Sequence, residues 1–142
     1  LPDNFYISQP CGKNDSPDFI VKVNGLAHFL ECKSVAKNTK APMYNSGIPK
    51  PAYLYIFTTE KSNATTIFYG EDVLPKEDYK TMEALIQKHR KVDREENPKF
   101  KNDYGIRHYT RPMITHVGGI DYFDPSVRFK REERILNELQ AL

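Results

Sequence analysis

The sequence predicts a mixed α/β domain of the α+β kind, because strand patterns and helix patterns occupy different parts of the chain. Runs rich in aromatic and β-branched residues, separated by turn residues, occur between residues 5 and 69. Apolar residues at helical spacing follow in 75–97 and again after 124. The 142 residues are enough for one core and too few for two, so we expect a single domain over residues 1–142.

The N-terminal part predicts three strands, two of which form a hairpin. Phe5-Tyr6-Ile7 is a short apolar run within a stretch rich in Pro, Asn, Asp and Gly. The β-rich runs 18–23 and 26–32 are separated only by Asn24-Gly25. This dipeptide is typical of a type I′ hairpin turn, because both central residues of that turn need a positive φ.

A long loop and two further strands follow the hairpin. Residues 34–52 contain three prolines, and a loop of this length in a small domain is typical of a segment that binds something. Residues 53–59 and 65–69 are aromatic and β-branched, which predicts two strands joined by a turn near 61–63.

Two amphipathic helices complete the predicted order. The first spans 75–97 and ends at Pro98, and its apolar positions are Tyr79, Met82, Leu85, Ile86 and Val92. Residues 100–123 are irregular, with short strands expected at 106–109 and 113–117. Asp124-Pro125 has the sequence of a helix start, and the inward-facing residues expected in this second helix are Val127, Ile135, Leu136, Leu139 and Leu142.

The composition excludes some classes of protein. No stretch approaches the ~20 apolar residues that span a bilayer, so no membrane partner is expected. Cys11 and Cys32 match no zinc motif and residues 1–30 resemble no signal peptide, so a cytoplasmic location is the simplest interpretation, although one disulfide stays open. The chain starts at Leu1, from which we expect a fragment of a longer protein. A net charge of +2 is too small to indicate nucleic acid by itself.

The hairpin register brings two carboxylates together. A two-residue turn pairs Val23 with Leu26, and counting outward places Asp18 directly opposite Glu31. Lys33 projects from the same face about 7 Å further along its strand. Like charges placed opposite each other are destabilising, so this arrangement needs a compensating partner. The other face of the hairpin is apolar and is predicted to be the core, with Phe19, Val21, Val23, Leu26 and Leu30.

Two converging carboxylates suit a hard divalent cation, because Mg²⁺ is usually bound by one or two carboxylates and keeps several waters. A cation at Asp18 and Glu31 would polarise a phosphoryl oxygen, and Lys33 would orient the attacking water or stabilise the developing negative charge. The site favours phosphodiester hydrolysis. The alternative is that these three residues belong to an ordinary solvated strand surface.

The same residues resemble a known nuclease signature. Ser16-Pro17-Asp18-Phe19 and, after a twelve-residue interval, Glu31-Cys32-Lys33-Ser34 are similar to the PD-(D/E)xK motif of the superfamily that includes type II restriction endonucleases. Softer similarities are Gln9-Pro10-Cys11-Gly12 and the stretch 47–51 that leads into 53–57. The resemblance covers about residues 5–59.

The resemblance implies a Mg²⁺-dependent endonuclease, in which Mn²⁺ can substitute. Asp18, Glu31 and the backbone carbonyl of Cys32 would hold the metal, and Lys33 would serve the attacking water. Such enzymes cut DNA to leave 5′-phosphate and 3′-hydroxyl ends. The implied fold is a restriction-endonuclease-like core, with a central mixed β-sheet flanked by helices. That core usually begins with a helix, and residues 1–18 have no helical periodicity, so we expect the helix to be missing from this fragment or replaced.

Residues expected to contact DNA lie in two segments besides the hairpin. No acid occurs between Ser34 and Phe57, which makes the long loop basic and a candidate for the phosphate backbone, although it could be an ordinary solvated loop. Further on, 88–96 reads as a solvated helix face, whereas basic residues beyond it lie in irregular chain and suit DNA contact better. The full set is Gln9, Lys37, Lys40, Tyr44, Asn45, Ser46, Lys50, Arg107, His108 and Arg111.

The expected partner is therefore double-stranded DNA. A homodimer is also expected, because dimerisation is common among restriction enzymes. Two other functions stay open. The motif does not distinguish a restriction enzyme from a repair or recombination nuclease that recognises DNA structure. A non-catalytic DNA-binding or assembly module is the third candidate, but such a module has no need to hold two carboxylates opposite each other.

Overall fold

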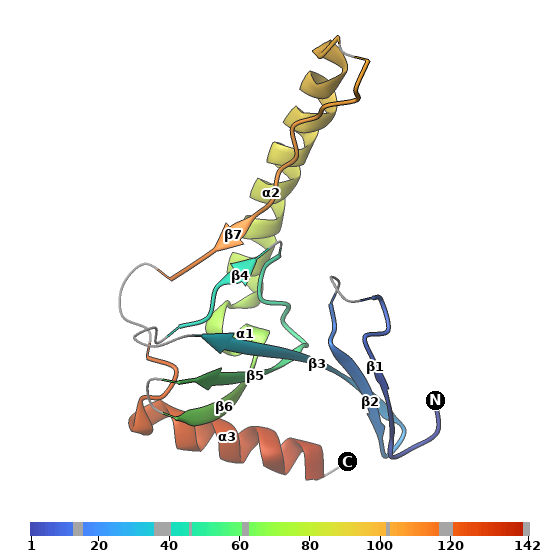
Figure 1. Cartoon of the computed structure of the whole chain (residues 1–142). Coiled ribbons are helices and arrows are strands. Elements are labelled where there is room, and N and C mark those ends of the chain that lie inside the picture. Colours follow the sequence, from blue (N-terminus) through green and yellow to red (C-terminus); the bar gives the residue numbers. More distant parts are fainter. Residues whose placement is uncertain are drawn as a thin grey trace.

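A five-stranded mixed sheet organises the computed structural model, which describes residues 1–12, 16–35, 41–45, 47–60, 63–101, 103–116 and 121–140 (Figure 1). Its order is β1-β2-β3-β5-β6, and β3 and β5 run parallel while the other neighbours are antiparallel. The strands are β1 Phe5–Ser8, β2 Phe19–Val23, β3 Leu26–Val35, β5 Leu54–Thr59 and β6 Ala64–Tyr69. The predicted α+β class is confirmed.

A second, two-stranded sheet and three helices complete the described chain. The small sheet pairs β4 with β7, and a 3₁₀ turn, η1, follows the longest helix directly. The bounds are β4 Tyr44–Asn45, β7 Met113–Ile114, α1 Gly70–Val73, α2 Lys76–Glu96, η1 Asn97–Lys99 and α3 Pro125–Gln140. The helix predicted over 75–97 is confirmed. The strand expected at 106–109 is wrong, because those residues run alongside α2 as irregular chain.

The hairpin has the predicted register. Val23 pairs with Leu26, and the pairing continues outward to Phe19 and Leu30. Asn24 and Gly25 both have a positive φ, of 49° and 80°, as a type I′ turn requires. Because the register follows from a two-residue turn, the next pair outward is Asp18 and Glu31.

The main core lies on the face of the sheet that also carries Glu31 and Lys33. The parallel pairing of β3 with β5 places Glu31 beside Tyr55 and Lys33 beside Phe57. Buried aromatic rings from three strands and from the segment before α3 meet there, namely Tyr44, Tyr55, Phe57, Phe68 and Tyr122. The prediction of a core on the opposite hairpin face is therefore wrong. Leu26 is exposed on that face and its apolar neighbours are only half-buried, because the hairpin extends beyond the helices (Figure 1).

Helix α3 covers the free edge of β6. The Arg131 side chain donates to the Ile67 carbonyl at 3.0 Å and to the Thr66 hydroxyl at 2.7 Å, while Arg128 donates to the Thr65 carbonyl at 3.0 Å. These bonds satisfy carbonyls that an edge strand otherwise leaves open. Ile135 is fully buried in this packing. The inward placement predicted for Val127 and Leu136 is wrong, since both are about half exposed; Leu139 is half-buried, and Leu142 lies outside the described residues.

Helix α2 projects away from the sheet, and residues 103–116 run back beside it (Figure 1). We call α2, η1 and residues 103–116 together the arm. Asp93 ties its two sides, accepting from the Thr110 backbone N–H at 2.8 Å and bonding the Thr110 hydroxyl and the His108 ring. The core role predicted for the apolar face of α2 holds only for Ile86, while Leu85 and Val92 are exposed because a single extended segment covers less of a helix than a sheet does.

Neither α2 nor any other helix in the described ranges combines the length and apolar character that a bilayer span requires. Cys11 and Cys32 are both exposed and both free, so no disulfide joins them.

Candidate functional site

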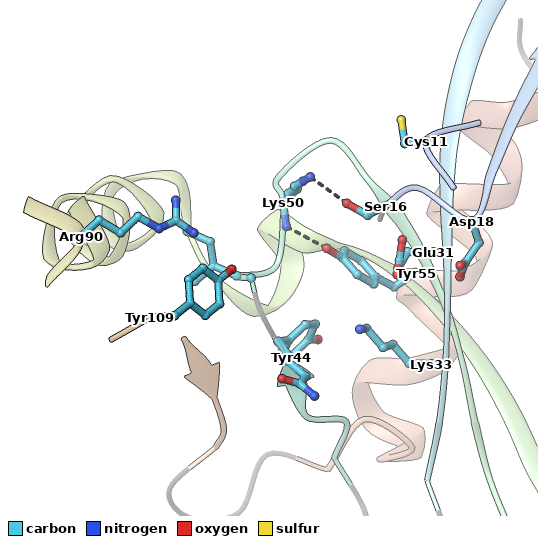
Figure 2. A pocket seen from close by; sticks show the side chains of 13 residues that line it. Cys11, Ser16, Asp18, Glu31, Lys33, Tyr44, Lys50, Tyr55, Arg90 and Tyr109 are labelled. Atoms are coloured by element: carbon cyan, nitrogen blue, oxygen red, sulfur yellow. Dashed lines mark hydrogen bonds between the residues drawn. The ribbon is translucent and has the colours of Figure 1, made fainter. Parts of the chain in front are cut away.

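A cleft of about 600 Å³ opens where the end of the hairpin, the loop before β5 and the arm meet (Figure 2). All three residues predicted to be catalytic line it. Its walls come from segments far apart in the sequence, and the full lining is Cys11, Ser16, Asp18, Glu31, Lys33, Tyr44, Asn45, Gly47, Ile48, Lys50, Tyr55, Arg90 and Tyr109.

Asp18 is fixed by the strand opposite it. One of its carboxylate oxygens, Oδ2, accepts a hydrogen bond from the Cys32 backbone N–H at 2.7 Å. The bond holds Asp18 against the stretch of β3 that carries Glu31 and Lys33, so the three side chains enter the cleft from one ribbon (Figure 2). Had the two carboxylates pointed to opposite faces, they could not line one cleft, so the predicted shared face is confirmed.

Glu31 is half-buried and incompletely paired. Its Oε2 atom is buried and has no hydrogen-bond partner in the described structure. Burial is the largest cause that raises the pKa of Glu31 above its ordinary value of 4.5, and the nearby Asp18 raises it further. Lys33, a backbone hydrogen bond from Asp18 and Lys50 act in the opposite direction without reversing the shift. The raised pKa therefore reflects mainly the burial of the Glu31 carboxyl group and its closeness to Asp18.

The side chain of Lys33 lies over the aromatic ring of Tyr44. Its Nζ atom is 5.5 Å from the centre of the Tyr44 ring, close enough for a cation–π contact. The Tyr44 hydroxyl is buried and lies 3.2 Å from the hydroxyl of Tyr122, which also bonds the His116 ring. Burial raises the pKa of Tyr44, so its hydroxyl group stays protonated and the ring contacts Lys33 as a neutral aromatic group.

Lys50 approaches the same carboxylates from the loop before β5. Its Nζ donates to the Ser16 hydroxyl at 2.8 Å and to the Tyr53 hydroxyl at 3.4 Å, and lies 4.7 Å from the centre of the Tyr53 ring. Its backbone N–H donates to the Tyr55 hydroxyl at 2.9 Å. A lysine held at both its backbone and its side chain is a fixed positive charge at the rim of the cleft.

The donor set suits one hard divalent cation. Asp18 and Glu31 contribute carboxylate oxygens, and the unpaired Oε2 of Glu31 is the buried atom whose deficit a cation would remove. No group of three or more His, Cys, Asp or Glu side chains with metal-binding geometry occurs in the described ranges. Two carboxylates, completed by a backbone carbonyl such as that of Cys32 and by water, correspond to the way Mg²⁺ is usually held.

The structure brings only some of the predicted DNA-contacting residues to this cleft. Tyr44, Asn45 and Lys50 line it. Lys37, Lys40 and Ser46 lie outside the described residues. Gln9 is exposed in the turn after β1, where its backbone N–H donates to the Asp18 carbonyl at 2.7 Å.

The three predicted contacts from the irregular C-terminal segment lie on the arm, outside the lining. Arg107 is exposed. His108 is bonded to Asp93, and its backbone is bonded to the Asn97 side chain at 2.7 and 2.9 Å. Arg111 lines a separate groove between α2 and residues 110–115.

Sequence reasoning missed the contribution of the arm to the cleft. Arg90 was assigned to a solvated helix face and Tyr109 to an expected strand, yet both line the cleft opposite the hairpin (Figure 2). Arg90 follows the buried Ile86 by four residues, a spacing that places both on the same helix face. This spacing was the sequence signal that could have placed Arg90 on the covered side of the helix. Tyr55 was also missed, because the parallel register that puts it beside Glu31 leaves no local sequence pattern.

Comparison of the chain with family models, with curated proteins and with solved structures gave no match.

Proposed function

We propose that the chain is a Mg²⁺-dependent endonuclease that hydrolyses phosphodiester bonds in DNA. The observation that carries the proposal is the convergence of Asp18, Glu31 and Lys33 in one cleft, with a buried oxygen of Glu31 left unpaired. A structural surface has no reason to bury one carboxylate against another, because the like charges repel. A binding site for a cation and a phosphate explains both the acids and the neighbouring lysines.

Each residue has a separate task in the proposed reaction. Asp18 and Glu31 would hold the ion, which when bound polarises a phosphoryl oxygen and makes water more acidic. Lys33 would orient the attacking water and stabilise the negative charge that develops on the phosphate. Lys50 would hold a phosphate oxygen at the rim, because its amino group is already fixed beside Ser16. Tyr44 keeps Lys33 in place through the face of its ring.

The proposal is tested by incubating the protein with supercoiled plasmid and with linear DNA, with Mg²⁺ or with EDTA. We expect cleavage with Mg²⁺ only, with products that carry 5′-phosphate and 3′-hydroxyl ends. Discrete fragments would identify a restriction enzyme, and cutting restricted to branches or unpaired regions would identify a structure-specific nuclease. DNA binding without cleavage under all of these conditions would favour the non-catalytic module instead.

The Asp18→Ala and Lys33→Ala variants should each abolish cleavage while leaving DNA binding largely intact. Lys22→Ala is the matched control, since Lys22 lies on the same hairpin face as Asp18 but about 13 Å along the strand. Lys22 is not part of the cleft lining. Full activity of Asp18→Ala or Lys33→Ala would contradict the proposed mechanism, and equal loss in Lys22→Ala would indicate a general charge effect.

A further inference from the structure

We infer that the arm forms a substrate-binding wall, in which Tyr109 stacks on a base and Arg90 binds a phosphate of one unpaired DNA strand. The inference rests on the proposed function, because it takes nucleic acid as the ligand of the cleft. It adds the residues on the far wall and the form of DNA that the cleft accepts.

Tyr109 is an exposed aromatic side chain on a fixed backbone. Its two neighbours are both tied to the arm, His108 by Asn97 and Asp93, and Thr110 by Asp93. Since the side chains of 108 and 110 turn towards α2, the side chain between them turns away, as it does in any extended segment. It lines the cleft and is 73% exposed. The arm therefore presents a large flat ring that packs against little of the protein.

Arg90 is a half-buried cation, and the acid three residues further along α2, Asp93, is already bonded to His108 and Thr110. Among the described residues its guanidinium makes no ion pair or hydrogen bond, although other cations on α2, such as Lys91, have an acidic partner one turn away. Arg90 lines the cleft next to Tyr109 and opposite the hairpin acids (Figure 2). An unpaired guanidinium in a polar cleft is suited to a phosphate, which it can bind through two parallel hydrogen bonds.

The dimensions and the lining of the cleft favour one strand over a duplex. Its volume of about 600 Å³ falls within the roughly 300–1,000 Å³ of small-molecule sites, so it holds a short piece of a strand between its two walls. The cations Lys33, Lys50 and Arg90 line it together with the exposed ring of Tyr109, whereas Tyr44 and Tyr55 are buried in the core. An exposed ring that can stack on a base, beside cations that can follow the backbone, is typical of sites for single strands. A base stacked on Tyr109 cannot remain paired within an intact duplex.

Binding of a labelled single-stranded oligonucleotide and of the corresponding blunt duplex, measured in EDTA so that no cleavage occurs, tests this inference. We expect the wild-type protein to bind the single strand at least tenfold more tightly. Tyr109→Ala should weaken single-strand binding by about tenfold, within the range found for loss of one stacking contact, and Tyr109→Phe should restore it. Arg90→Gln should make the negative slope of log K against log salt shallower by about 0.7, the value for one phosphate contact on a single strand.

Two substitutions on the same arm provide matched controls. Tyr104→Ala removes a tyrosine that is 90% exposed, and Arg94→Gln removes an arginine one turn further along α2; neither residue lines the cleft. Both variants should bind like the wild type. Equal or tighter binding of the duplex would overturn the inference, as would unchanged binding by Tyr109→Ala and Arg90→Gln.

Failure of this inference and failure of the proposed function give different results. Single-strand binding that depends on Tyr109 and Arg90, without any Mg²⁺-dependent cleavage, would support the binding role of the arm and contradict the proposed endonuclease activity. Cleavage of DNA by a protein that binds the intact duplex more tightly, and whose binding is unchanged by both substitutions, would support the endonuclease activity and contradict the binding role of the arm.

Discussion

The ionised carboxylate of Glu31 should lower the stability of the protein when no cation is bound, and this effect should depend on pH. Burial and Asp18 raise its folded-state pKa above the ordinary 4.5. A carboxyl group whose pKa is raised by folding lowers stability at pH above that pKa, and the effect disappears as the pH falls through it. The ionised form is therefore tolerated for a reason other than stability, which the proposed cation provides.

The variant Glu31→Gln should accordingly be more stable than the wild type at pH 7 in EDTA. We expect a higher Tm for the variant, by a small amount, because the half-buried carboxyl group is still partly screened by solvent. The gain should shrink as the pH falls towards the raised pKa of Glu31, because the wild-type carboxyl then becomes neutral too.

Thermal unfolding between pH 4 and 8 measures this difference. Glu60→Gln, an exposed acid outside the cleft, is the control and should show no comparable gain. Mg²⁺ should raise the Tm of the wild type and not that of Glu31→Gln. A wild-type protein that is more stable than Glu31→Gln at pH 7 in EDTA would show that burial of Glu31 imposes no penalty.

Among the elements, α3 protects the edge of the sheet. Arg131→Met should remove hydrogen bonds to Ile67 and Thr66, together with one to the Tyr122 carbonyl. Hydrogen bonds from a charged group contribute about 1.5–3 kcal/mol, so we expect a loss of about 2–3 kcal/mol. This corresponds to a fall of roughly 4–12 °C in Tm.

Denaturation and light scattering together measure the effect on the edge. Lys130→Met changes the neighbouring exposed residue by the same loss of charge and should leave Tm nearly unchanged. Because an uncovered edge strand pairs with other chains, Arg131→Met should also aggregate at lower temperature. Equal Tm values for the two variants would mean that α3 is held to β6 by its apolar contacts alone.

Asp93 fastens the returning segment of the arm to α2. Hydrogen bonds from Thr110 and His108 hold the pKa of Asp93 below its ordinary 3.8. The stability from an acid with a lowered pKa is present above its unfolded-state value and is lost as the pH falls through the folded-state value. Asp93→Ala should therefore loosen residues 103–116 at neutral pH, and its stability deficit should vanish only below pH 3.8.

Hydrogen exchange at the Thr110 amide, which donates to Asp93, measures the loosening directly. We expect faster exchange in Asp93→Ala and unchanged exchange in Asp103→Ala, which removes an exposed acid from the same segment. If the Thr110 amide exchanges at the wild-type rate in Asp93→Ala, the arm is held by other contacts.

The elements also explain how far the sequence could be interpreted. The hairpin, the site face and the ends of α2 follow from local signals, namely the Asn24-Gly25 turn, period-two alternation and Pro98. The pairing of β3 with β5 joins residues more than twenty positions apart, and its consequence, Tyr55 beside Glu31, leaves no local trace. The core was assigned to the wrong face because the hairpin was considered without its neighbour.

The molecule as a whole joins three separate parts at the cleft. The hairpin provides the acids and Lys33, the loop before β5 provides Lys50, and the arm provides Arg90 and Tyr109. β4 pairs with β7, which ends the returning side of the arm, so Tyr44 and the arm are directly linked. The geometry of the cleft therefore depends on contacts between these parts as much as on the residues that line it.

Gly70 controls one of those contacts, where β6 turns into α1. Its N–H donates to the Tyr53 carbonyl at 3.1 Å, and a Cβ atom added there would lie 2.0 Å from the Lys50 carbonyl oxygen and 2.5 Å from its carbonyl carbon. These are backbone atoms, which cannot turn aside as a flexible side chain can. Glycine is therefore required here by close approach, and the position of Lys50 depends on it.

Gly70→Ala should push the Lys50 backbone out of place and so weaken both the fold and the cleft. We expect a loss of about 1–3 kcal/mol, the usual cost of overpacking, and reduced DNA binding because the Lys50 amino group leaves Ser16. Thermal unfolding and DNA binding in EDTA measure the two effects, and Lys50→Ala shows the binding loss without the clash. Gly47→Ala is the stability control, since a Cβ atom there meets nothing within 4 Å. Should Gly70→Ala be as stable as Gly47→Ala, the loop would yield to the added methyl group, and Lys50 would not be fixed by the packing of its backbone.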